Sequence, residues 1–136
     1  MQYIIAIALL VTPLSLTAGE AEPMVPDRFI GTWAGSNSSC GSDSDDLRLH
    51  IGSRRIVYWE SEGPILAVVV RGREIALIAE LSGEGHTWLA TAKFTISAHG
   101  GMLVDRTSGP GKQVVRYRCP GPAREQRPLK RHIPSS

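Results

Sequence analysis

The amino-acid sequence predicts an all-β domain, in which about eight antiparallel strands form a meander that closes as a small barrel with one disulfide bond. Three observations predict this class. Short runs rich in β-branched and aromatic residues recur between residues 26 and 119, Gly-containing turns separate them, and no amphipathic helical stripe interrupts them. An open sheet of that many strands has two exposed edges, and closure into a barrel removes both.

The expected strands lie at 29–35, 47–51, 55–60, 65–71, 74–81, 87–97, 102–106 and 113–119. Turns are expected at 52–53, 62–64, 72–73, 82–85, 99–101 and 109–111, because Gly supplies positive φ and Pro fixes φ. Alternation assigns the faces of the longest strand, whose apolar row is Trp88, Ala90, Ala92, Phe94 and Ile96. The run at 65–70 does not alternate. Burial on both faces is the favoured interpretation, and an outer face that meets a partner is the alternative.

The N-terminal segment is interpreted as a signal peptide at residues 1–19. Residues 3–16 are apolar and uncharged, and small residues follow them. A membrane-spanning helix needs about 20 apolar residues, so this run is short for a span and matches the apolar core of a signal peptide. A retained N-terminal anchor is the alternative. We therefore expect an exported protein, either periplasmic or secreted.

Export gives the two cysteines a role. Cys40 and Cys119 are 79 positions apart, and in an oxidising compartment they are expected to pair. Closing a loop of that length stabilises a fold by about 4–5 kcal/mol in the chain-entropy model. The bond would tie the chain just after the first strand to the end of the last strand, and these two strands are neighbours in a closed barrel.

A short motif opens the first expected strand, Phe29-Ile30-Gly31-Thr32-Trp33. Its Gly-x-Trp resembles the first-strand motif of lipocalins and other calycin barrels, including avidin-like proteins. It is also similar to that of small bacterial protease inhibitors with a lipocalin-like barrel and one disulfide. The resemblance implies that Trp33 closes the bottom of the barrel against a late arginine, Arg116 or Arg118. The lipocalin Thr-Asp-Tyr motif is absent from the sequence, and Trp33 as a simple core aromatic is the alternative.

Catalytic signatures are missing from the sequence. There is no Gly-x-Ser-x-Gly elbow, no His-Glu-x-x-His pair and no phosphate-binding glycine loop. We therefore expect a non-enzymatic protein without cofactor or metal. An enzyme would have to use Glu84 and His86, two apart in one hairpin tip, with Asp105. Asp43, Asp45 and Asp46 lie in a polar segment that lacks the calcium-loop pattern, so a surface loop is expected there.

The charge balance is nearly neutral, with 15 basic and 13 acidic residues, which does not indicate nucleic-acid binding. Most of the basic excess falls in a Pro-rich segment at 120–136, expected to be a disordered tail with at most a weak contact to an anionic surface. The expected organisation is a signal peptide at 1–19, an N-terminal arm at 20–26, a barrel at 27–119 and this tail.

These features predict an exported, monomeric β-barrel binding protein whose partner is a small apolar ligand or another protein. The walls of a ligand pocket would be aromatic: Trp59, Trp88, Tyr58 and Phe94. A protein partner would contact the segment at 20–27 and the loops at one end of the barrel. The alternatives are an inhibitor of a secreted hydrolase, either a protease or a lysozyme, and a small envelope enzyme using Glu84 and His86.

Overall fold

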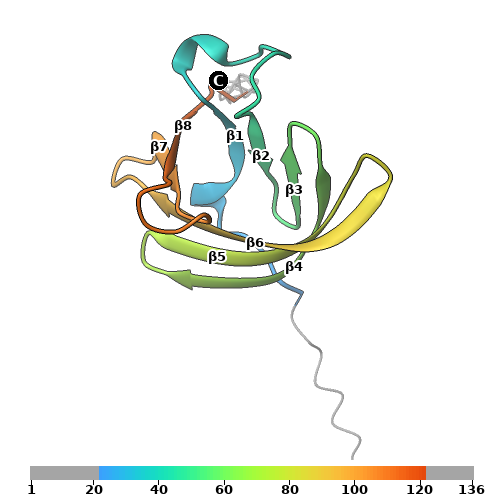
Figure 1. Cartoon of the computed structure of the whole chain (residues 1–136). Helices are drawn as coiled ribbons and strands as arrows, with labels where there is room; N and C mark the ends of the chain where they lie inside the picture. The colour runs from blue at the N-terminus through green and yellow to red at the C-terminus, as the bar shows by residue number, and fades with distance from the viewer. Residues whose placement is uncertain (1–21, 122–136) are drawn as a thin grey trace, which may run out of the picture.

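The computed structural model describes residues 22–121 and shows a closed barrel of eight strands, each hydrogen-bonded to the next in chain order (Figure 1). The strands are β1 (Gly31–Ala34), β2 (Leu49–Ile51), β3 (Arg55–Tyr58), β4 (Glu62–Arg71), β5 (Glu74–Gly83), β6 (His86–Ile96), β7 (Met102–Asp105) and β8 (Val114–Arg118). All neighbours are antiparallel, and β8 returns to pair with β1. The predicted all-β barrel is therefore confirmed. Among residues 22–121, no helix is long and apolar enough to cross a membrane.

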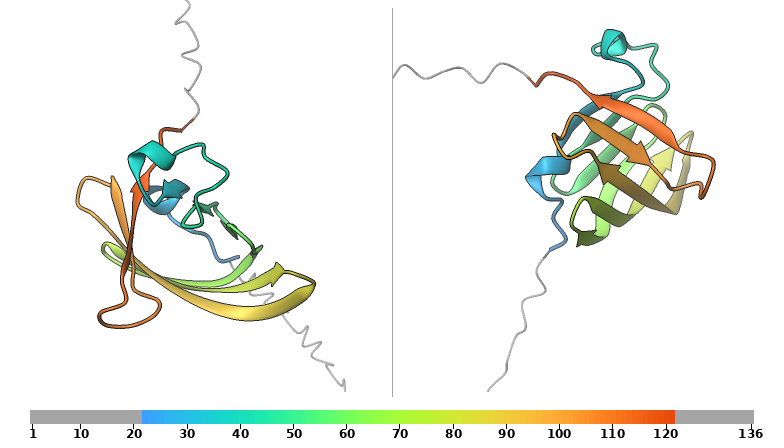
Figure 2. Two further views of the ribbon diagram at one scale, coloured as in Figure 1. Left: turned by 45° about the horizontal axis from the view of Figure 1, so that its top comes forward. Right: turned by 90° about the vertical axis from the view of Figure 1, so that its left-hand side faces the viewer.

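The barrel is lopsided. Its three longest strands, β4, β5 and β6, form one curved sheet, and the shorter strands arch over it (Figures 1 and 2). The pairing of β4 with β5 extends from Glu62 opposite Ser82 to Arg71 opposite Glu74. The pairing of β5 with β6 extends from Glu74 opposite Thr95 to Gly83 opposite His86. These segments read as near-continuous runs of strand-forming residues, so nothing ends them before ten residues.

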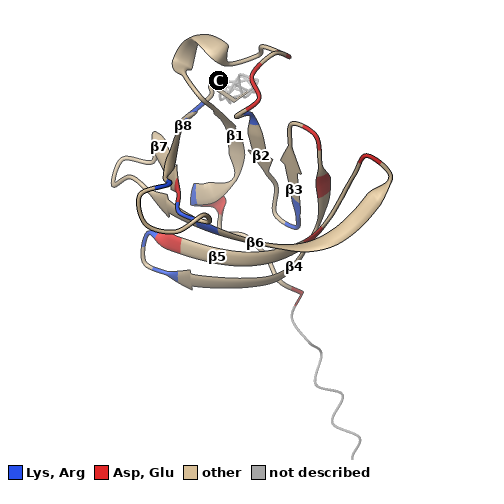
Figure 3. Ribbon diagram, viewed as in Figure 1, with Lys and Arg blue, Asp and Glu red and all other residues tan. Residues whose placement is uncertain are grey.

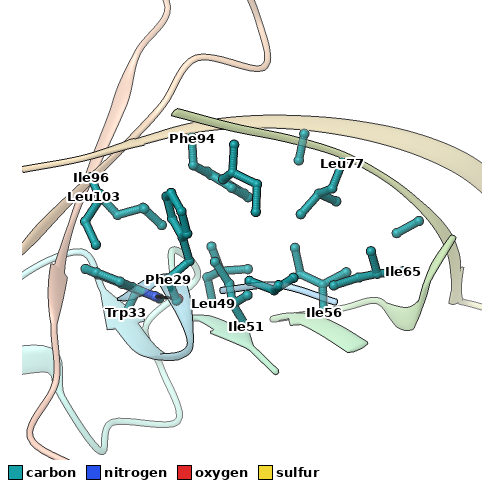
Figure 4. Packing of buried hydrophobic residues seen from close by; sticks show 14 of the residues in the cluster. Phe29, Trp33, Leu49, Ile51, Ile56, Ile65, Leu77, Phe94, Ile96 and Leu103 are labelled. Carbon is teal, nitrogen blue, oxygen red and sulfur yellow. Dashed lines mark hydrogen bonds between the residues drawn. The ribbon is translucent and has the colours of Figure 1, made fainter. Parts of the chain in front are cut away.

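The interior of the barrel is filled by side chains. Alternate residues of every strand point inward, and together they form one cluster of buried apolar residues (Figure 4). Its largest members, with less than 2% exposure, are Trp33, Phe29, Phe94, Leu49, Ile51, Ile56, Ile75, Leu103 and Val25. An eight-stranded barrel is just wide enough for its side chains to fill it.

One end of the barrel is closed by Trp33 and a short 3₁₀ helix, Asp27–Phe29. The Trp33 indole N–H donates to the Phe29 carbonyl at 3.1 Å, which docks the helix across this end. The guanidinium of Arg118 lies 4.1 Å from the centroid of the Trp33 ring. Arg118 also donates to the carbonyls of Ile30, Gly100 and Arg28, and burial lowers its pKa.

The barrel-closing role assigned to Arg116 therefore belongs to Arg118. The register decides between the two arginines, because Arg118 lies directly opposite Trp33 while Arg116 lies opposite Leu103. Gly31 is required for the arrangement. A Cβ at this position would lie 2.8 Å from the Arg118 guanidinium, and its φ of +147° is one that side chains rarely adopt.

Two expectations about where strands begin were wrong. The first strand does not include Phe29, which lies in the 3₁₀ helix. The turn expected at 62–64 is part of β4, and residues 59–61 make the turn instead. Gly63 is there because the two backbones approach closely, and a Cβ would lie 1.7 Å from the Glu80 carbonyl oxygen. Pro64 has no register partner on β5, so its missing N–H costs no hydrogen bond to that strand.

The run at 65–70 is buried on one face only, which corrects the favoured interpretation. A β-bulge between Ile65 and Ala67 shifts the register. Leu66 lies in the bulge and is 47% exposed. After the bulge, Val69 faces outward and is 58% exposed. The bulge explains why the sequence does not alternate there: it inserts one extra residue on the outer side.

The chain ends are described only in part. The expected signal peptide at 1–19 and most of the tail at 120–136 lie outside the described residues. Within the N-terminal arm expected at 20–26, of which residues 22–26 are described, Val25 is buried and donates from its backbone to the Ser53 carbonyl at 2.8 Å. Glu22 forms an ion pair with Arg54. The arm thus packs against the barrel near the β2–β3 turn.

The predicted disulfide is confirmed. Cys40 and Cys119 are bonded, with their Cα atoms 5.5 Å apart. Cys119 follows β8 and its backbone N–H donates to the Thr32 carbonyl of β1, so the bond reinforces the seam where the barrel closes.

We expect the double variant Cys40→Ser/Cys119→Ser to lose about 4 kcal/mol of unfolding free energy, because the 79-residue loop is then open in the unfolded state. Urea denaturation followed by tryptophan fluorescence measures the loss. The wild-type protein under reducing conditions should match the variant, and an unchanged midpoint in both would contradict the prediction.

Candidate functional site

A cleft of about 360 Å³ opens at the end of the barrel opposite the 3₁₀ helix. It is lined by Asp46, Tyr58, Trp59, Glu60, Ser61, Leu81 and Ala90. These residues come from the loop between β1 and β2, from the β3–β4 turn and from the inner rows of β5 and β6. We call this region the open end. It is a surface concavity above the filled core rather than a chamber within it.

Trp59 is an exposed aromatic residue of the open end. β3 ends at Tyr58, whose backbone N–H donates to the Ser61 carbonyl at 2.7 Å, so residues 59–61 form a tight turn. The Trp59 indole N–H donates to the Asp43 carbonyl at 3.3 Å, and the ring is 46% exposed. The hydrogen bond joins the turn to the β1–β2 loop, so the two segments form one surface.

The β1–β2 loop, residues 35–48, stands off the barrel at the top of Figures 1 and 3. Within it, Ser36 and Ser39 form a reciprocal hydrogen-bonded cap around a second 3₁₀ helix, Asn37–Ser39. Cys40 anchors the loop to the end of β8 through the disulfide. The other end of the loop brings Asp43 and Asp46 to the β3–β4 turn.

Asp45 holds this loop in shape from beneath. Its carboxylate accepts hydrogen bonds from the backbone N–H of Gly35 at 2.9 Å, from that of Leu47 at 3.0 Å and from the Ser39 hydroxyl at 3.0 Å. Burial by itself would raise the pKa of Asp45, but these hydrogen bonds and the nearby charge of Arg116 lower it overall. Asp45 is therefore a structural anchor for the loop.

A buried ion pair lies just below the open end. Arg116 donates to the Asp105 carboxylate at 2.9 Å and to the Leu47 carbonyl at 2.7 Å. Burial and the negative charge of Asp105 raise the pKa of Tyr58 to about 12, against an opposing effect of Arg116. All three side chains face the interior, so the upper core is polar where the lower core is apolar.

The structure brings together some of the residues expected to line a pocket and separates others. Tyr58 and Trp59 both line the cleft. Trp88 lies directly opposite Leu81 at the rim and is 41% exposed. Phe94 does not belong to the cleft; it is buried in the core, with 1% of its surface exposed.

The residues considered for catalysis do not converge. Glu84 and His86 are exposed at the β5–β6 turn, where Glu84 and Gly85 both take positive φ to reverse the chain. Asp105 pairs with Phe94, eight residues along β6 from His86, and strand rise puts that at about 26 Å. Its carboxylate is bound to Arg116 instead. Among residues 22–121, no group of three His, Cys, Asp or Glu side chains is placed to hold a metal ion.

Sequence reasoning missed the roles of Asp45 and of the Arg116–Asp105 pair. The Asp45-Asp46-Leu47 segment carries an available signal, because an aspartate that accepts from the N–H two residues later is a common turn. The ion pair had no local signal, since its partners lie on separate strands.

Comparison of the chain with protein-family models, curated proteins and solved structures gives no match.

We expect Asp45→Ala to cost about 2–3 kcal/mol of unfolding free energy at neutral pH, because two partly buried backbone N–H groups lose their acceptor. Since the pKa of Asp45 is lower in the folded state, its contribution is full above its ordinary value and is lost as pH falls through the folded value. Urea unfolding of both proteins at pH 7 and at about pH 2 should show the difference shrinking with acid.

The matched control for this measurement is Asp46→Ala, an exposed neighbour in the same loop. It should unfold like the wild type at both pH values. An equal loss for the two variants would contradict the anchoring role of Asp45.

Tyr58 should titrate late. Its pKa of about 12 predicts a phenolate absorbance step that is missing in Tyr58→Phe. Because the folded pKa is raised, the stabilisation linked to neutral Tyr58 is present below the ordinary value of 10.0 and is lost between there and about pH 12. Absorbance titration of the two proteins measures the step, and a Tyr58 step near pH 10 would show that the phenol is solvated.

Proposed function

We propose that this chain is an exported, non-enzymatic binding protein that takes a protein partner at the open end of the barrel. The observation that carries the proposal is Trp59, an exposed aromatic that a hydrogen bond fixes to a disulfide-anchored loop above a filled interior. The Cys40–Cys119 bond also supports the export that the N-terminal sequence predicts, because such bonds persist in oxidising compartments.

The filled interior favours a protein over a small apolar ligand. Small-molecule sites are enclosed and enfold most of the ligand, whereas the cleft at the open end is shallow and faces solvent. Phe94, the inward-facing aromatic expected to line a deep pocket, packs in the core and leaves no surface for a ligand. A concavity of this size suits one side chain or loop of a partner.

The exposed tryptophans and the fixed loop of the open end suit binding to a protein. Tryptophan is the residue type most enriched among those that dominate binding energy, and Trp59 and Trp88 are both partly exposed at the rim. The loop beside Trp59 is fixed by the disulfide and by Asp45, so little conformational entropy is lost when a partner binds it.

A narrower candidate is inhibition of a secreted hydrolase, either a protease or a lysozyme. The fixed projection of residues 35–48 favours it, because an enzyme cleft accommodates a rigid protruding loop (Figure 1). The Trp33–Arg118 stack across the closed end is the arrangement implied by the resemblance to lipocalin-like barrels, a group that includes small inhibitors.

The test compares partner capture by matched variants. The wild-type protein is immobilised and exposed to the secreted and envelope proteins of its source cells, and the retained protein is identified and titrated. Trp59→Ala should weaken this complex at least about 10-fold, as truncation of a central tryptophan does. Met24→Ala, which removes an exposed apolar side chain away from the open end, should leave the affinity unchanged.

A second titration with an apolar naphthalene sulfonate dye separates the two ligand classes. We expect no saturable one-to-one binding, because the interior is filled. Stoichiometric dye binding, or a partner complex that tolerates Trp59→Ala, would overturn the proposal. Inhibition of a purified protease or lysozyme that is lost in the same variant would establish the narrower candidate.

A further inference from the structure

The outer face of the β4–β5–β6 sheet is a second surface, on the opposite side of these strands from the core. The register places its residues in five cross-strand rows. From the closed end to the open end these rows hold Arg71, Glu74 and Thr95; Val69, Ala76 and Lys93; Ala67, Ile78 and Thr91; Glu80 and Leu89; and Glu62, Ser82 and Thr87. Leu66 lies at the β-bulge, between the third and fourth rows. We call this surface the outer face.

The centre of the outer face is apolar and uneven. Four large apolar side chains on this face are between 41% and 68% exposed: Leu66, Val69, Ile78 and Leu89. Such a group of exposed apolar side chains on one face of a sheet is unusual. The short side chains of Ala67 and Ala76 leave a groove of about 190 Å³ between them. Projecting leucines and an adjacent groove are the two halves of a complementary contact.

The charges on the outer face are segregated. Arg71 and Lys93 lie in the two rows at the closed end, with Arg106 beside them in a cleft of about 450 Å³. Glu80 and Glu62 lie in the two rows at the other end, where Glu62 also forms an ion pair with Arg55 of β3 at 2.8 Å. Glu74 is the one acid within the basic end. In Figure 3 the central stretches of β4 and β5 carry no charged residue and lie between charged residues at the two ends of the strands.

From this pattern we infer that the outer face binds a second copy of the chain, forming a symmetric dimer in which the two sheets pack face to face and antiparallel. A two-fold axis through the central row, at Ile78, places the basic end of each copy over the acidic end of the other. Lys93 then lies near Glu80 of the second copy, and Arg71 lies over its Glu62, whose carboxylate also accepts from Arg55 of its own chain. The groove beside Ala76 receives a projecting leucine in the same arrangement.

Self-complementarity selects this occupant. A membrane surface would be repelled by the acidic end, and a partner of one charge sign would match only half of the face. A copy rotated by 180° matches both halves at once. Facing sheets pack in this manner in β-sandwiches, about 10 Å apart.

The size of the face sets the expected strength. Three strands of ten residues span about 15 by 33 Å, or about 500 Å² for each copy. A standard stable interface takes about 800 Å² for each partner, so we expect a reversible dimer with a Kd in the micromolar range. The open ends stay free on both copies, and the dimer would therefore present two of them to a partner.

Sedimentation velocity of the purified exported protein, from about 1 µM to about 500 µM, brackets the expected affinity. The wild type should shift from monomer to dimer across this range. Ile78→Glu, at the two-fold axis, should abolish the shift, while Met24→Glu, an exposed apolar position off the outer face, should leave it intact.

A charge-swap series tests the antiparallel arrangement without disturbing the apolar centre. Lys93→Glu and Glu80→Lys should each raise the dimer Kd at least about 5-fold, because each creates two like-charge contacts across the symmetric interface. The double variant Lys93→Glu/Glu80→Lys should restore the wild-type Kd. Circular dichroism checks that every variant is folded.

Three outcomes would overturn the inference. The first is a wild-type protein that stays monomeric at every concentration, and the second is a dimer that neither Ile78→Glu nor Lys93→Glu weakens. The third is a double variant that does not regain affinity, which would exclude the proposed orientation of the two sheets.

Discussion

The pairing of β1 with β8 is the constraint on which the rest of the structure depends. Only Trp33 and Ala34 of β1 have register partners on β8, so the ladder at this seam is short. It is reinforced by the backbone hydrogen bond from Cys119 to Thr32, by the disulfide to Cys40 and by the Arg118 guanidinium. Each hydrogen bond is worth about 1 kcal/mol net, whereas the disulfide contributes several. The seam holds because covalent and side-chain interactions supplement two residue pairs.

Arg118 shows how the seam and the closed end are coupled. Its guanidinium covers the Trp33 ring and donates to three carbonyls in two segments: those of Arg28 and Ile30 in one, and that of Gly100 in the other. These carbonyls lie at the 3₁₀ helix and at the β6–β7 turn, where no strand partner reaches them. One long side chain therefore satisfies the backbone groups that barrel closure leaves unpaired, at the cost of partial burial of a charge.

Closure of so small a barrel also decides where the two proposed binding surfaces lie. Large aromatic and branched side chains fill the interior, so both proposals use the rim or the exterior. The open end and the outer face differ physically: the first is a shallow concavity beside a fixed loop, and the second is an uneven apolar sheet with segregated charge. They lie on different sides of β5 and β6, so occupation of one leaves the other accessible.

The sequence by itself determined the strand order, the closure and the disulfide. Those properties follow from local patterns, namely alternation, Gly-containing turns and two cysteines, each of which acts over a few residues or through a unique pairing. It also brought Tyr58 and Trp59 forward, because aromatic residues at the end of a strand are visible in the chain. It did not show that residues 62–64 continue β4, since Gly63 answers to the Glu80 backbone on another strand. Nor did it choose Arg118 over Arg116 or expose the outer side of the run at 65–70. Those choices depend on register, and a single β-bulge is enough to change which side chains face the core.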